Sequence, residues 1–164
     1  MKLKLSLFLV VVFFVGCGDQ LEFNNPALEA RKDDVLWKSE SREAITGTNI
    51  LTIKGYLENE TITLKILVPY EGVYPLGVES TTVAYFNDGE TEYSTAFNPV
   101  DDPETEENES LIYPAEGEIV IDEINSLQGY VSGSFWFRAY DNLGEQAVNF
   151  SQGVFYEVST LIDE

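Results

Sequence analysis

Short runs of β-branched and aromatic residues, separated by turn-forming residues, dominate the chain from Val35 onward. The runs recur about every 8 to 12 residues, a spacing typical of all-β sandwiches and barrels. No stretch carries an apolar face of a dozen residues at the helical period. The sequence therefore predicts an antiparallel β-sandwich or a partly open barrel of about 8–10 strands.

Three pairs of runs flank short polar turns, and each pair predicts a β-hairpin. A further run predicts a strand over residues 117–122, with Ile119 and Ile121 facing inward. Trp37 is expected in the core and Gly153 at a β-bulge. The hairpins are expected to join residues 50–57 to 61–68, residues 82–86 to 92–97, and residues 130–140 to 146–158.

The first residues predict export from the cytoplasm. Lys2 and Lys4 precede an apolar run over residues 5–15, which is broken only by Ser6. This run is shorter than the ~20 residues that span a bilayer, and it is typical of a signal peptide. We expect a signal peptide over residues 1–16.

The residues that follow the predicted signal peptide suggest a tether. We expect a lipidated Cys and a flexible tether over residues 17–34, in which residues 27–32 could form one helical turn. A segment this short does not hold a helix by itself. A single β-sandwich-like domain is then expected over residues 35–164.

The composition excludes several chemistries. The chain has no His and one Cys, so His-dependent catalysis, an intrachain disulfide and a thiolate zinc site are excluded. It has 29 acidic residues against nine basic ones, and its net charge is -20. Nucleic-acid binding requires a basic surface, so a nucleic-acid partner is not expected.

The sequence Phe14-Val15-Gly16-Cys17 resembles the bacterial lipobox. The resemblance implies that Cys17, the only Cys of the chain, is lipidated and becomes the mature N-terminus. The membrane would then be a partner through the lipid, and the protein would be anchored to the outer membrane on its periplasmic or cell-surface side. The alternative is an ordinary signal peptide followed by a free Cys.

Several stretches together resemble a family of small lipoproteins from Bacteroidota, mostly flavobacteria. The resemblance covers most of residues 35–158, and the family's domain has no assigned function. It implies a β-sandwich-like domain on the cell envelope and transfers no catalytic residue. The stretches are the lipobox, Trp37, Gly72-Val73-Tyr74-Pro75-Leu76-Gly77, Val131-Ser132-Gly133-Ser134-Phe135-Trp136-Phe137 and Gly153-Val154-Phe155.

The predicted strand over residues 130–140 has two distinct faces. One face, expected in the core, carries Val131, Gly133, Phe135, Phe137 and Ala139. The other carries the candidate ligand-binding residues Tyr130, Trp136, Arg138 and Tyr140, together with Ser132 and Ser134. Aromatic rings beside a guanidinium suit stacking on a sugar ring or contact with a protein. The alternative is that a second layer or a loop covers this face, or that the rings only stabilise the sheet.

An acidic segment over residues 98–114 is a weaker candidate site. Clustered carboxylates can bind Ca²⁺, which takes 6–8 oxygen ligands. The candidate ligands are Asp101, Asp102, Glu104 and Glu106, but the spacing lacks the EF-hand pattern. The alternative is a solvated acidic loop. No other cofactor is expected.

These observations favour a non-enzymatic, lipid-anchored domain of the cell envelope that binds a glycan or an envelope protein through an aromatic face. A second hypothesis is a structural or accessory subunit of an envelope complex, with no small ligand. A third is a small glycoside-active enzyme that uses two carboxylates about 5–9 Å apart.

Overall fold

The computed structural model describes residues 25, 27–99 and 113–162, and these residues form eleven β-strands and no helix. Cys17 and the candidate calcium ligands Asp101, Asp102, Glu104 and Glu106 lie outside the described residues. The strands are β1 (Ala27–Lys32), β2 (Val35–Lys38), β3 (Ser41–Gly47), β4 (Ile50–Leu57), β5 (Glu60–Leu67), β6 (Gly72–Gly77), β7 (Val83–Asn87), β8 (Glu92–Ser94), β9 (Glu116–Asn125), β10 (Tyr130–Asp141) and β11 (Ala147–Ile162).

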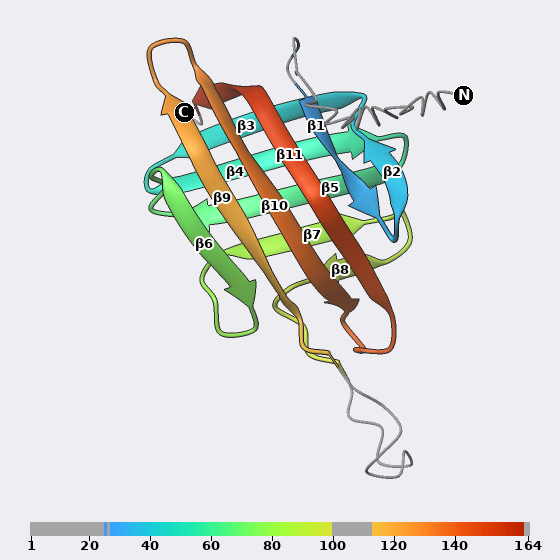
Figure 1. Cartoon of the computed structure of the whole chain (residues 1–164). Coiled ribbons are helices and arrows are strands. Elements are labelled where there is room, and N and C mark those ends of the chain that lie inside the picture. The colour runs from blue at the N-terminus through green and yellow to red at the C-terminus, as the bar shows by residue number, and fades with distance from the viewer. Residues whose placement is uncertain (1–24, 26, 100–112, 163–164) are drawn as a thin grey trace, which may run out of the picture.

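The strands form two packed layers that cross at an angle (Figure 1). The first layer has the order β2-β1-β11-β10-β9-β6, and the second has the order β3-β4-β5-β7-β8. The end of β11 pairs with β3, and Tyr140 and Asp141 of β10 pair with β8, so the layers are joined at two corners. The predicted all-β sandwich or partly open barrel is confirmed, but the described residues form eleven strands where about 8–10 were predicted. The β11–β3 pair is parallel, however, so the sheet is mixed rather than purely antiparallel.

All three predicted hairpins are present in the structure. They are β4–β5, β7–β8 and β10–β11. The strand predicted at residues 117–122 lies within β9, and both Ile119 and Ile121 are buried. None of the described residues belongs to a helix long and apolar enough to cross a membrane.

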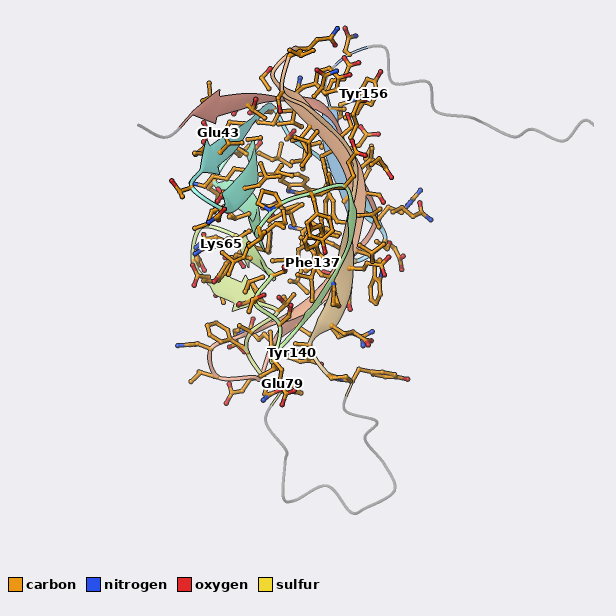
Figure 2. All side chains as sticks on the ribbon, turned by 90° about the vertical axis from the view of Figure 1, so that its left-hand side faces the viewer. Glu43, Lys65, Glu79, Phe137, Tyr140 and Tyr156 are labelled. Carbon is orange, nitrogen blue, oxygen red and sulfur yellow. The ribbon has the colours of Figure 1, made fainter. Side chains whose placement is uncertain are left out.

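The core lies between the two layers and contains a cluster of aromatic rings. Figure 2 shows Phe137 pointing into the space between the layers. Phe150 of the first layer is 4.7 Å from the Phe137 ring and 5.1 Å from the ring of Phe86 in the second layer. Trp37 packs edge-on against Phe150 at 6.3 Å, so its predicted place in the core is confirmed.

The tether predicted over residues 17–34 is wrong for its last part, because Ala27–Lys32 is strand β1 and not a helical turn. β1 pairs with β11 on one side and with β2 on the other, and Leu28 is 0% exposed. Asp33 and Asp34 both have positive φ and form the tight turn to β2. The domain therefore begins near residue 27 and not at Val35, because pairing with β11 outweighs the helical propensity of this segment.

β11 is bent by two bulges. The β10–β11 register shifts between Phe135 and Phe137 and again between Val131 and Gly133. In each case β11 contains one extra residue, and nearby Gln152 and Glu157 have positive φ. Bulges increase the local twist, which helps β11 to leave the first layer and reach β3. The bulge predicted at Gly153 is confirmed, since the first extra residue lies directly before it.

Candidate functional site

The alternation predicted for β10 holds along most of the strand. Phe135 and Phe137 are buried, whereas Trp136 is 44% exposed and points away from the second layer. We call this side of the first layer, formed by outward residues of β9, β10 and β11, the outer face. Figure 2 shows Tyr156 of β11 on the same side. The Trp136 indole is therefore accessible to a ligand.

Trp136 borders an open groove of about 410 Å³ on the outer face. The groove spans three adjacent strands and combines apolar surface with hydroxyl, amide and carboxylate groups. We call it the Trp136 groove, and its lining residues are Glu118, Val120, Ser134, Phe135, Trp136, Ser151, Gln152 and Gly153. Such a mixture of apolar surface and a few polar groups is typical of a site that orients a small ligand.

The bulge in β11 shapes the floor of the Trp136 groove. A Cβ atom at Gly153 would lie 2.6 Å from the carbonyl oxygen of Phe135, which is too close for any side chain. Gly153 therefore allows β11 to approach β10 closely, and part of Phe135 lines the groove. Gln152, whose φ is 52°, lies at the bulge and lines the groove beside Gly153.

Arg138 lies on the outer face two residues beyond Trp136 and is held by three neighbours. Its Nε donates a hydrogen bond of 2.8 Å to Oδ1 of Asn149. Its Nη1 lies 3.5 Å from Oε1 of Glu116, and its guanidinium stacks 4.7 Å from the centre of the Tyr113 ring. The side chain is therefore fixed in position, with its charge balanced by Glu116.

The prediction that Tyr140 binds a ligand is wrong. It is only 8% exposed, and its hydroxyl donates a hydrogen bond of 2.6 Å to the backbone oxygen of Tyr113. The strand pattern placed Tyr140 on the outer face, but the last residues of β10 pair with β8 at the corner between the layers. The backbone at Tyr113 also contacts Tyr140 there, so this side chain has a structural role.

Tyr130 is partly exposed but lies far from Trp136. The two residues are six positions apart on one strand, which corresponds to about 20 Å. The Tyr130 hydroxyl donates a hydrogen bond of 2.8 Å to Oε1 of Glu123, and this bond raises the pKa of Tyr130. The four candidate residues thus do not form one site: Trp136 and Arg138 lie together, whereas Tyr130 and Tyr140 lie elsewhere.

The structure adds residues to the site that the sequence prediction missed. Glu118 lies directly opposite Trp136 on β9, and Gln152 reaches the groove from β11. The alternation of residues 117–122 already indicated that Glu118 points outward, but the pairing partner of β9 could not be read from it. Tyr113 had no recognisable signal, because it follows an acidic segment in which the sequence predicts no strand.

The proposed calcium site stays a prediction, since its ligands lie outside the described residues. Within the described ranges, no group of three or more Asp, Glu, Cys or His side chains is placed to hold a metal ion. The Asp88 carboxylate accepts hydrogen bonds from the backbone amides of Thr91 and Glu90, and these bonds help to lower its pKa. This arrangement stabilises the turn between β7 and β8.

Comparison with known proteins places the domain in a family without assigning an activity. No curated protein matches the chain, and no solved structure matches it. A family model described as a domain of unknown function, DUF6252, matches residues 24–159. This match covers nearly all the described strands, and it agrees with the predicted β-rich domain of unknown function. The chain belongs to the DUF6252 family.

Proposed function

We propose that this domain is a non-enzymatic binding module that recognises an uncharged glycan in the Trp136 groove. The observation that carries the proposal is the exposed indole of Trp136 beside a groove that also offers hydroxyl, amide and carboxylate groups. A sugar ring has an apolar face that stacks on an aromatic ring and an edge of hydroxyl groups that need hydrogen-bond partners. Ser134, Gln152 and Glu118 are suited to bind that edge.

The charge of the protein supports an uncharged glycan over an acidic one. The net charge of the chain is -20, and the groove itself contains the carboxyl group of Glu118. Like charges brought together cost free energy, so a uronic-acid polymer or a sulfated glycan would be repelled. A neutral glycan lacks this repulsion.

The carboxyl groups on β9 support binding over hydrolysis. Glu116 and Glu118 are two positions apart on one strand, which corresponds to about 7 Å, a separation also found in glycosidases. A glycosidase needs one of its two carboxyl groups as a proton donor. Glu116 is instead ion-paired with Arg138, which also stacks on Tyr113. We therefore propose that this pair positions Arg138 and has no catalytic role.

Trp136→Ala is expected to weaken glycan binding by roughly 30-fold or more, since a central aromatic contact contributes about 2 kcal/mol. The melting temperature is expected to change by no more than a few degrees, because the side chain is exposed. The measurement is calorimetric titration of the full-length chain in detergent with a panel of neutral and acidic glycans, with Ca²⁺ and with EDTA.

Leu127→Ala is the matched control, because Leu127 is fully exposed in the turn between β9 and β10. This variant should bind as the wild-type chain does. Three outcomes contradict the proposal: no glycan binds, only acidic glycans bind, or oligosaccharides are cleaved during the titration. The first would favour a protein partner or a purely structural subunit.

We also propose that a lipid on Cys17 anchors the protein to the cell envelope, as the resemblance of residues 14–17 to a lipobox suggests. The resemblance to a lipoprotein family of the Bacteroidota suggests a bacterium of that group as the source. The family match supports this arrangement, because it begins at residue 24 and leaves the predicted signal peptide and Cys17 outside the domain. Two or three acyl chains give stable membrane attachment.

Cys17→Ser is expected to release the protein from membranes, since Ser cannot take the lipid of Cys17. The measurement is the distribution of the protein between membrane and soluble fractions after a carbonate wash, with the wild-type chain processed in parallel. A variant that stays in the membrane fraction would refute lipid anchoring at this residue.

A further inference from the structure

We infer that the site takes a linear oligosaccharide rather than a single sugar, and that Tyr113 forms a second stacking position beyond the Trp136 groove. This inference rests on the proposed glycan binding and adds to it the class of ligand and a residue that selects for length. It follows from the position of Arg138, which lies two residues beyond the exposed Trp136 on β10 and stacks on the exposed Tyr113.

The side chains of Trp136, Arg138 and Tyr113 are aligned on the outer face. Trp136 and Arg138 are two positions apart on the same side of β10, which corresponds to about 7 Å along the strand. The Arg138 guanidinium lies 4.7 Å from the centre of the Tyr113 ring. The indole, the guanidinium and the phenol therefore follow one another along the outer face, over a length greater than one sugar ring.

Tyr113 is both accessible and held in place. Tyr113 is 54% exposed, so it remains accessible although its ring stacks on Arg138. Its backbone oxygen accepts the hydrogen bond from the Tyr140 hydroxyl, and Ala115 two residues later is buried. A contact that is fixed before binding loses little conformational entropy when a ligand arrives.

The outward residues of β10 indicate the direction in which a bound chain of sugars extends. From Trp136 toward the other end of β10, the next outward residues are Ser134 and Ser132, which have no ring. Tyr130 is about 20 Å away, and its hydroxyl is bonded to Glu123. Along β10, a chain of sugars anchored at Trp136 therefore finds its next aromatic contact at Tyr113 and not at Tyr130.

The test is calorimetric titration of the full-length chain, in detergent, with cello-, xylo- and manno-oligosaccharides of two to six units. For at least one series, the wild-type affinity is expected to rise about fivefold between the dimer and the longer oligomers, as a second stacking contact contributes about 1 kcal/mol. The Tyr113→Ala variant should bind the dimer with the wild-type affinity, but its affinity should not increase for longer oligomers. The Tyr113→Phe variant should retain the increase of affinity with length.

Tyr70→Ala is a closely matched control. Tyr70 is 60% exposed, and its backbone oxygen also accepts a hydrogen bond from a buried tyrosine, Tyr74. Tyr70 does not line the Trp136 groove, so removal of its side chain should leave the increase of affinity with oligomer length unchanged.

The possible outcomes separate this inference from the proposed function. Wild-type binding that depends on Trp136 but not on oligomer length would overturn the inference and leave the proposed function intact. An equal loss at every length in Tyr113→Ala would also overturn it. No binding of any oligomer by the wild-type chain would overturn both. The length dependence of the wild-type chain requires no variant, so the inference stays testable even if Tyr113→Ala does not fold.

Discussion

Gly133→Ala is expected to destabilise the domain by about 3 kcal/mol or more, because the added methyl group has no space. Gly133 lies in the middle of β10, buried between β9 and β11. A Cβ atom there would overlap the carbonyl oxygen of Val120 and the ring of Phe155. The Val120 oxygen belongs to the backbone of the paired strand, so it can move only if the β9–β10 pairing is disturbed. Thermal unfolding should show a fall in melting temperature of about 10 °C, or no cooperative transition.

Gly47→Ala is the control for the glycine substitution itself. Gly47 ends β3, and a Cβ atom there would meet no other atom within 4 Å. Replacement of a glycine in an ordinary backbone conformation restricts the unfolded chain, so stability should stay the same or rise by up to about 1 kcal/mol. If Gly133→Ala melted within two degrees of Gly47→Ala, the close approach of β9 and β11 to β10 would be wrong.

The local pattern of β10 could be predicted from the sequence because side chains alternate strictly along a strand. Phe135 and Phe137 are buried and Trp136 is exposed, as the alternation predicts. The same pattern was misleading for Tyr140, since it shows the side to which a residue points but not what lies above it. The contact from Tyr113 comes from a distant part of the sequence, so no local pattern predicts it.

The complete site could not be predicted for a related reason. Glu118 and Gln152 lie near Trp136 only because β9 and β11 both pair with β10 in a particular register. These registers depend on one-residue bulges in β11 and in β9, and a shift of one residue reverses the side to which every following side chain points. The turn residues predicted the hairpins, but they did not predict the order of the strands in the two layers.

The fold is expected to depend on β1. A chain that begins at Asn25 is expected to fold, whereas a chain that begins at Asp33 is expected not to fold. The shorter chain lacks Leu28, which is completely buried and packs against Gly55 of β4 together with Trp37. Burial of one leucine contributes about 1.5–3 kcal/mol, a large part of the 5–15 kcal/mol that stabilises a typical domain.

The loss of β1 also removes the strand with which β2 and β11 pair. β2 pairs with β1, and residues 150–156 of β11 pair with it on the other side. Lys32, at the end of β1, forms an ion pair with Glu60, which also accepts a hydrogen bond of 2.7 Å from the Trp37 indole. Without β1, Trp37 and the backbone of β11 would be exposed to water, so several contributions are lost together.

Circular dichroism in the near-ultraviolet and thermal unfolding of the two chains provide the measurement. A cooperative transition in the shorter chain, within a few degrees of the longer one, would show that the domain begins at Val35 and that β1 is dispensable.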